Sequence, residues 1–427
     1  MTGVDRRRFL TGSLATLGAG GIGAAVGANL GEQGTAAAST QANAAAQAQQ
    51  VNVRALNSRV PFDGPHQAGI LTPAPDQATW VALDSIVPDR STLMQTLQSI
   101  TQQARQLSQG EGIGLQEIED PPPDSGVLGP VNSPDSLTVT VAFGHTLFDS
   151  RYGLRALRPK RLIEMPTFNN DRIDPARAGG DILLQVCAGQ RDTVVHTVRE
   201  LLRTVAGKLV VRWTLDGFQA AQRGPTQRSS KRNLFAFRDG TANPEVTNAE
   251  LMNRLVWVQS GARGEPSWTT GGTYIVARAI RMHVEFWDRV GMLEQEQMIG
   301  RDRVTGAPLG GKGEYEDPRY DLDPKGDRIP LDAHIRLANP RTDATAQQRI
   351  LRRGYNYHRG IDEAGNLDQG LMFVAFNQDP KRQFATIQNR LSAEPMVDYI
   401  TPVGGGYFFA PRGARGQADW VGSGLAV

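Results

Sequence analysis

The chain of 427 residues has little cysteine, little net charge and no long apolar run. Its single cysteine, Cys187, excludes an internal disulfide, a cysteine-rich zinc site and an iron–sulfur cluster. The 46 basic and 44 acidic residues leave a formal charge of +2, too small for long-range attraction to nucleic acid or an anionic membrane. With 39% hydrophobic residues, the chain can still bury one large core or two ordinary ones. We therefore expect a folded protein without a nucleic-acid partner.

Several common catalytic patterns are also missing. The six histidines show neither His-x-x-x-His nor His-Glu-x-x-His spacing, so zinc hydrolase chemistry is not expected. There is no Gly-x-Ser-x-Gly sequence for a nucleophilic serine. The glycine-rich stretches 310–313 and 404–406 lack the strand, loop and helix context of a nucleotide-binding loop.

The N-terminus resembles a Tat export signal. Arg6 and Arg7 precede Phe9, and a Gly/Ala-rich stretch over 11–30 follows that is too weakly apolar for a stable membrane helix. The alternative is an ordinary basic N-terminus. Residues 1–45 are therefore set apart as a signal peptide, which predicts a periplasmic, extracellular or cell-surface location without stable membrane insertion. Because Tat carries folded proteins, the signal also favours a protein with a cofactor.

The rest of the chain shows a repeated pattern of strands and helices. Apolar spacing predicts strands at 78–86, 137–144, 181–188 and 209–215 and helices at 90–108 and 193–205. The pattern recurs with strands at 273–282, 371–376 and 399–409, a helix start at 284–287 and a helix at 380–393, and 334–338 is our candidate for the missing middle strand. This order predicts an α+β fold of two duplicated ferredoxin-like (βαββαβ) domains, 55–232 and 233–427, with antiparallel sheets and peripheral helices.

Two long polar segments do not fit this pattern. Residues 154–178 are rich in Arg, Pro and Asp, and residues 300–330 are rich in Gly, Asp and Pro. Segments of this kind are usually surface loops and sometimes form walls of a site.

Three short sequences remain that carry chemistry. They are Phe235-Ala-Phe-Arg-Asp-Gly-Thr-Ala-Asn-Pro244, His334-Ile-Arg-Leu-Ala-Asn-Pro-Arg341 and Ile350-Leu-Arg-Arg-Gly-Tyr355. They resemble the dye-decolorizing peroxidases, a family of haem enzymes, and especially the Tat-exported bacterial branch that includes deferrochelatases. The resemblance extends from about residue 61 to 411 and implies a duplicated ferredoxin-like fold. The family signature Gly-x-x-Asp-Gly has Ala236 at its first position here, which we expect to need a local backbone adjustment.

The resemblance implies a role for one residue in each sequence. Asp239 is the distal acid/base, His334 the proximal iron ligand and Arg352 the distal arginine. A carboxylate can take the proton of hydrogen peroxide and return it to the departing oxygen, and a fixed guanidinium stabilises the negative charge that develops. Imidazole is a common axial ligand of haem iron. Taken singly, the same residues also fit a turn, a core histidine and a solvated Arg352–Arg353 pair on a helix.

The residues beside these three are expected to form the rest of a haem pocket. The backbone amides of Gly240, Thr241 and Ala242 are expected to approach the haem edge, because Gly and Ala leave room. Asn339, Pro340 and Arg341 follow the ligand closely enough to touch the haem, with Arg341 as a propionate partner. No Cys-x-x-Cys-His sequence exists, so one non-covalent haem b per chain is expected. His66, His145 and His283 are expected to be structural. Candidates for relaying an oxidising equivalent to the surface are Trp257, Trp268, Trp287, Tyr355 and Tyr357, and Met292 and Met298 are considered on the same footing.

Three functions remain open at this point. The first is a peroxidase that reduces hydrogen peroxide and oxidises small aromatic, phenolic or dye-like donors by one-electron steps. The second is a haem- or iron-handling protein of iron acquisition with incidental peroxidase activity, for which an iron-uptake permease is the candidate partner. The third, a cofactor-free ferredoxin-like binding module, does not explain the His334 to Arg352 motif. A homodimer is compatible with each of them.

Overall fold

A computed structural model describes residues 55–110, 121–221, 230–262 and 264–426. The predicted signal peptide over 1–45 lies outside the described residues. Within the described part of the chain, no helix is long and apolar enough to cross a membrane.

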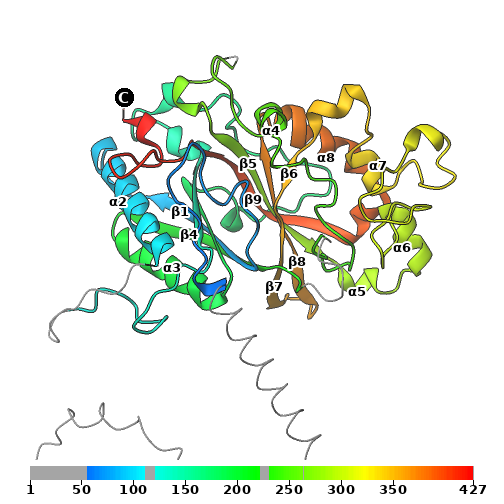
Figure 1. The fold of residues 1–427 in the computed structure, drawn as a ribbon, viewed down its shortest axis with the longest axis horizontal. Coiled ribbons are helices and arrows are strands. Elements are labelled where there is room, and N and C mark those ends of the chain that lie inside the picture. Colours follow the sequence, from blue (N-terminus) through cyan, green and yellow to red (C-terminus); the bar gives the residue numbers. More distant parts are fainter. Residues whose placement is uncertain (1–54, 111–120, 222–229, 263, 427) are drawn as a thin grey trace, which may run out of the picture. The chain divides into compact units, whose positions relative to one another are not determined.

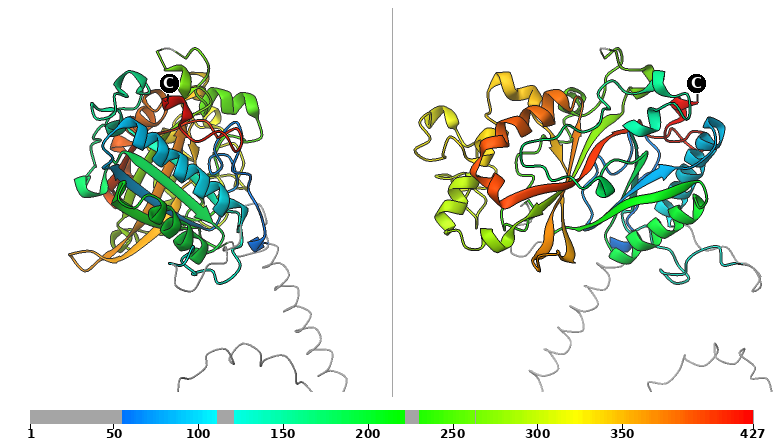
Figure 2. Two further views of the ribbon diagram at one scale, coloured as in Figure 1. Left: turned by 90° about the vertical axis from the view of Figure 1, so that its left-hand side faces the viewer. Right: turned by 180° about the vertical axis from the view of Figure 1, so that it is seen from behind.

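The N-terminal half contains the elements that the sequence predicts, with bounds shifted by a few residues. They are β1 (Gln77–Ser85), α2 (Arg90–Gln109), β2 (Thr138–Gly144), β3 (Ile182–Ala188), α3 (Arg191–Thr204) and β4 (Leu209–Phe218). The four strands form an antiparallel sheet in the order β4-β1-β3-β2. Helices α2 and α3 lie side by side against this sheet (Figures 1 and 2).

Helix α2 shows why local sequence was a good guide in this half. The Asp89 side chain accepts a hydrogen bond from the backbone N–H of Thr92 at the helix start, and Gly110 ends the helix with φ 65°. Leu93, Leu97 and Ile100, which recur at helical spacing, are all buried against the sheet.

The C-terminal half holds five strands and five α-helices among its described residues. The strands are β5 (Thr273–Met282), β6 (Leu351–Arg352), β7 (Tyr355–Ile361), β8 (Leu367–Asn377) and β9 (Ile400–Ala410). The helices are α4 (Ala249–Leu255), α5 (Val284–Trp287), α6 (Met292–Ile299), α7 (His334–Ala338) and α8 (Thr386–Arg390). The predicted helix over 380–393 is helical from residue 381 onward, as a π turn (Lys381–Ala385), then α8, then a 3-10 turn (Leu391–Ala393).

One predicted strand is wrong. Residues 334–338 form the helix α7, in which the N–H of Leu337 donates to the carbonyl of Ala333. Five residues are too few to separate a period of 2 from one of 3.6, so the alternation there carried little information. The middle strand of this half is β7, whose Tyr355 and Tyr357 are buried, and the strand order is β9-β5-β8-β7 with β6 at the edge of β8.

Short pairings join the two sheets into one closed ring. β2 meets β9 through Phe143 and Gly144, β4 meets β7 through Phe218, and β5 also pairs with β8. The interior between the sheets is filled with side chains, which include Trp80, Cys187, Trp213, Tyr355 and Phe408. In the N-terminal half, α2 and α3 cover the opposite faces of β1, β2 and β3, whereas β4 leaves residues such as Val210 and Val211 exposed. Burial on both faces explains the near-continuous apolar runs of β1, β2 and β3.

Candidate active site

The main candidate site is a cavity formed wholly by residues between 233 and 400. It contains about 1490 Å³ of space that protein atoms do not fill, part of it open to solvent. One wall is formed by Ile280, Leu371 and Phe373 of β5 and β8. The other walls come from the loop that contains Asp239, from α6, α7 and β6, from residues between 301 and 320, and from the turns around α8. The lining is mainly apolar, with a few charged groups at defined places. A flat, mostly apolar ligand with polar ends fits such a space.

His334 stands at the first position of α7 and lines this cavity. Its Nδ1 lies 2.7 Å from Oε2 of Glu394, whose side chain is buried. Burial lowers the pKa of His334, but the Glu394 carboxylate outweighs burial, so the pKa is raised overall. Because Nδ1 is engaged by the carboxylate, Nε2 is the nitrogen available to a ligand.

Asp239 and Arg352 lie together on the same cavity. Arg352 Nη1 is 2.8 Å from Asp239 Oδ1, and both side chains are about one quarter exposed. Their charges act on His334 in opposite senses, since Arg352 lowers and Asp239 raises its pKa. The structure therefore brings together the three residues that the motifs singled out, although 113 positions separate Asp239 from Arg352 in the sequence.

The turn before Asp239 has an unusual backbone. Ala236 has φ 68°, in the left-handed region that favours glycine. The turn is fixed by the Asn233 side chain, which accepts from the N–H groups of Phe235 and Phe237. Ala236 therefore holds a conformation that glycine adopts more readily, and the expected backbone adjustment at this position stays a prediction.

Asn243 fixes the position of Arg352. Its Nδ2 donates to the Arg352 carbonyl at 2.7 Å, and its Oδ1 accepts from the Arg352 N–H at 3.0 Å. The side-chain amide thus makes the pair of hydrogen bonds to Arg352 that a residue of a neighbouring β-strand would make. This contact holds the loop that carries Asp239 against the strand that carries Arg352.

The neighbouring residues from the sequence motifs divide into two groups. Thr241, Ala242, Asn339 and Arg341 line the cavity, and Thr241 Oγ1 also donates to Glu314. Gly240 and Pro340 do not line it. Gly240 borders a neighbouring hollow that shares Asp239 and Arg352, and Pro340 faces a surface hollow next to Arg341.

Cations gather at the cavity without enough acid to balance them. Burial is the main cause that lowers the pKa of Arg301, and Arg341 adds to it although Tyr320 and Glu314 act in the opposite direction. Burial and Arg341 also lower the pKa of Arg349. Arg349 Nε is buried and makes no hydrogen bond. Arg341 contacts Asp317 at 3.1 Å. Guanidinium groups in this state favour an anionic partner such as a carboxylate. With His334 and the apolar walls, they fit a haem.

Sequence reasoning missed several residues of the site. Glu394, Arg301 and Arg349 carry no spacing signal, because a lone acid or arginine in a loop has no periodic neighbour. Asn243 could have been found from the sequence, because it belongs to the motif that contains Asp239. The polar segment 300–330 does contribute a wall, through Arg301, Pro318 and Tyr320.

Histidines and aromatic residues elsewhere have packing partners. The His66 ring stacks on Trp257 with centroids 3.6 Å apart, and its Nδ1 lies 2.8 Å from the Gly271 carbonyl. Trp287 stacks on Phe235 beneath the turn that leads to Asp239. None of His66, His145 and His283 lines the cavity. The aromatic relay stays a prediction.

Comparison with known proteins places both halves in one family. Residues 67–219 match the family described as Dyp-type peroxidase, N-terminal, and residues 230–415 match Dyp-type peroxidase, C-terminal. The deferrochelatase of Escherichia coli K12 is 44% identical over 374 residues, 87% of this chain and 88% of the relative. That of Yersinia pestis is 43% identical over 366 residues, 86% of this chain and 84% of the relative.

Similar solved structures point to the same family. The DyP-type peroxidase from Cellulomonas bogoriensis has 37% identity and a TM-score of 0.77, covering 87% of this chain and 99% of that one. Ferric DtpA from Streptomyces lividans has 32% identity and a TM-score of 0.78, covering 86% and 97%. Matches of this extent and identity show that the chain belongs to the Dyp-type peroxidase family and is a haem peroxidase.

Proposed function

We propose that the protein reduces hydrogen peroxide and oxidises phenolic or dye-like donors by one-electron steps, with one haem b per chain in the cavity of the C-terminal half. The observation that carries this proposal is the convergence of the His334–Glu394 and Asp239–Arg352 pairs on one apolar cavity. The bound haem supplies a redox-active iron.

On the His334 side, the residues hold and orient the group. His334 Nε2 is the proposed iron ligand, and Glu394 accepts the Nδ1 proton, which fixes the tautomer and the direction of the ring. Arg341 and Arg349 are the proposed partners of the haem carboxylates.

On the other side, Asp239 and Arg352 share the work on peroxide. Asp239 takes a proton from one peroxide oxygen and returns it to the other as it leaves as water. Arg352 stabilises the negative charge on the separating oxygens without taking part in proton transfer. Their separation of 2.8 Å places both groups within reach of one small molecule.

Three variants test these roles. His334→Ala should abolish or strongly weaken haem retention, and a fully native absorption spectrum would overturn the ligand assignment.

Asp239→Asn should keep the haem and slow the reaction with peroxide by about two to four powers of ten. Arg352→Leu should also slow it, and the double variant should lose less than the product of the two effects because both act on one step. A wild-type rate in stopped-flow mixing of Asp239→Asn with peroxide would contradict the role of Asp239.

A second function, handling of haem iron, is favoured by the 43–44% identity to deferrochelatases. It predicts that the purified protein releases iron from added haem and leaves a metal-free porphyrin, which fluoresces. The wild-type protein and Asp239→Asn should be compared in both assays. Porphyrin release without dependence on Asp239 would separate this function from peroxide reduction.

The finer architecture is also a proposal. We propose that 55–232 and 233–427 are duplicated ferredoxin-like units. This is supported by the strand orders β4-β1-β3-β2 and β9-β5-β8-β7, which correspond position by position when the strands of each half, β6 left aside, are numbered along the chain. We propose Tat export to the periplasm, cell surface or exterior on the sequence of residues 1–45. Changing both Arg6 and Arg7 to Lys should leave folded, haem-loaded protein in the cytoplasm, and unchanged export would show the proposal to be wrong.

A further inference from the structure

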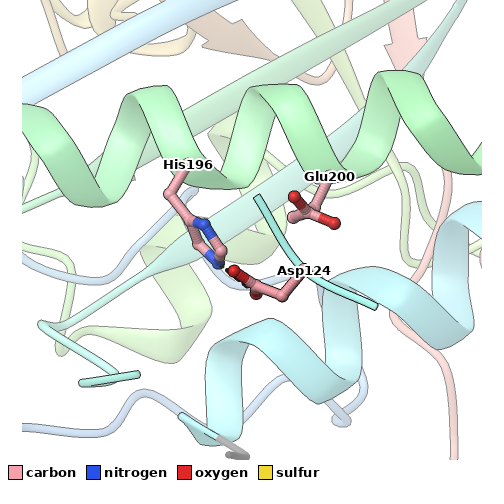
Figure 3. Close-up of side chains that lie close together, drawn as sticks. All are labelled: Asp124, His196 and Glu200. Carbon is pink, nitrogen blue, oxygen red and sulfur yellow. Dashed lines mark ion pairs between the residues drawn. The ribbon is translucent and has the colours of Figure 1, made fainter. Parts of the chain in front are cut away.

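A second group of ionisable side chains lies in the N-terminal half, outside the cavity of residues 233–400. His196 and Glu200 project from neighbouring turns of α3 toward Asp124, which belongs to the connection between α2 and β2 (Figure 3). One possible ligand atom of each residue lies within 4.8 Å of those of the other two. His196 and Glu200 are buried, and the Asp124 side chain is 11% exposed.

The His196 ring points Nε2 into this group, where it forms an ion pair with Asp124 when the imidazole is protonated (Figure 3). Nε2 is buried and makes no hydrogen bond, although Asp124 Oδ2 is 3.3 Å away. Nδ1 lies 2.9 Å from Ser125 Oγ. If Nδ1–H donates to that hydroxyl, Nε2 carries a lone pair directed at the two carboxylates. Leaving such an atom without a partner costs free energy, so a ligand at this point is favoured.

The carboxylates of Asp124 and Glu200 can each accept further bonds. Glu200 accepts one hydrogen bond at each oxygen, from the Ser125 N–H at 2.9 Å and from Arg203 at 2.8 Å. Asp124 likewise accepts one at each oxygen. A carboxylate offers about four lone-pair positions, two on each oxygen, so each of these oxygens keeps one lone pair without a hydrogen bond.

We propose that Asp124, His196 and Glu200 bind a divalent transition-metal cation of the Zn²⁺ type, separate from the haem iron. One imidazole and two carboxylates suit such a cation, with water completing the coordination. The His196-x-x-x-Glu200 spacing puts two ligands on one helix face, as in helical zinc sites, with glutamate in place of the second histidine. Ligand atoms about 2.0–2.2 Å from the metal lie roughly 3.4 Å apart in a tetrahedron. The ligand atoms of this group lie within 4.8 Å of one another, so binding needs side-chain shifts of no more than about 1–1.5 Å.

The consequence of binding is structural. The cation would link the connection between α2 and β2, through Asp124, to α3, through His196 and Glu200. A cation that binds the folded chain alone stabilises it in proportion to the logarithm of its concentration over Kd.

The test uses the haem-loaded, untagged chain, freed of loosely bound metal with EDTA and equilibrated with micromolar ZnCl₂. Elemental analysis of the dialysed protein should give one Zn²⁺ per wild-type chain, not displaced by millimolar Mg²⁺. Asp124→Asn, His196→Asn and Glu200→Gln should each lose it, with an unchanged haem spectrum and unchanged peroxidase kcat. Zn²⁺ should raise the Tm of the wild type by about 5 °C and leave that of Glu200→Gln unmoved.

The matched control is His145→Asn, which removes a half-buried histidine outside any such cluster among the described residues. It should retain the zinc. If His196→Asn does not fold, Asp124→Asn decides, because its side chain lies in a loop at the edge of the site. The proposal is overturned if the wild type holds no more zinc than Asp124→Asn or Glu200→Gln, or if His145→Asn loses as much as they do.

Discussion

Ala236 shows how a single residue shapes the site. It has φ 68° in the turn that leads to Asp239, and its N–H donates to the carbonyl of Asn233 at 2.9 Å. A left-handed conformation costs a non-glycine residue about 1–2 kcal/mol. The left-handed conformation of Ala236 therefore lowers the stability of the folded chain, while the loop keeps the shape that places Asp239 at the cavity.

Replacing Ala236 by glycine should relieve this strain. Because glycine also loses more entropy on folding than alanine, we expect a net gain of about 0.5–1 kcal/mol in the free energy of unfolding. Gly240→Ala, at φ 91°, is the matched control and should lose stability. Denaturant unfolding of the two variants and the wild type measures both effects. A destabilised Ala236→Gly would show that the left-handed turn carries no strain.

At the scale of elements, the site depends on joining a loop to a strand. Asn243 pairs with both backbone groups of Arg352, so the loop of Asp239 and the strand β6 move as one body. Arg352 is thereby a strand residue with a fixed backbone rather than part of a solvated arginine pair, and its neighbour Arg353 is buried.

Asn243→Ala should loosen Arg352 without touching the reacting atoms. We expect kcat/KM for hydrogen peroxide to fall by about ten- to a hundredfold while kcat/KM for the reducing donor stays near the wild-type value. Stability should drop by about 1–3 kcal/mol, since two backbone groups lose their partner. Steady-state kinetics in both substrates separates the two roles, and an equal fall for peroxide and donor would contradict a positioning role.

Cys187 belongs to the packed interior between the sheets. It is a fully buried free thiol, and burial raises its pKa, so it is a poor nucleophile at neutral pH. Cys187→Ala should leave peroxidase activity per bound haem intact and cost about 1 kcal/mol of stability for the small cavity. Activity and thermal unfolding of the variant check this. Loss of turnover in folded, haem-loaded protein would assign the thiol a redox role.

For the whole molecule, three partly buried histidines lower stability in acid. Burial lowers the pKa of His66, His145 and His283. Each therefore stays neutral in the folded chain at a pH where the unfolded chain, with a pKa of about 6.5, already takes up a proton. The stability that these neutral rings contribute is present above about pH 6.5 and is lost as the pH falls below it.

The free energy of unfolding should accordingly fall between about pH 7 and pH 5. His66→Gln removes one of these groups and should make the fall shallower, whereas the exposed His358 serves as the control position for the same substitution. Denaturant titrations at each pH measure the slope. An identical slope for His66→Gln and the wild type would exclude His66 as a source of the pH dependence.

The sequence by itself determined the features that are local. Capped helices and apolar strands of the N-terminal half follow from residue spacing within ten to twenty positions, and Asp239, His334 and Arg352 each lie in a short motif. Only tertiary packing decided which of these residues meet. The partners His334–Glu394 and Asn243–Arg352 lie 60 and 109 positions apart, and the middle strand is β7 rather than 334–338 because the closed sheet buries Tyr355 and Tyr357. Spacing reports local backbone preference, whereas such contacts depend on how distant elements pack.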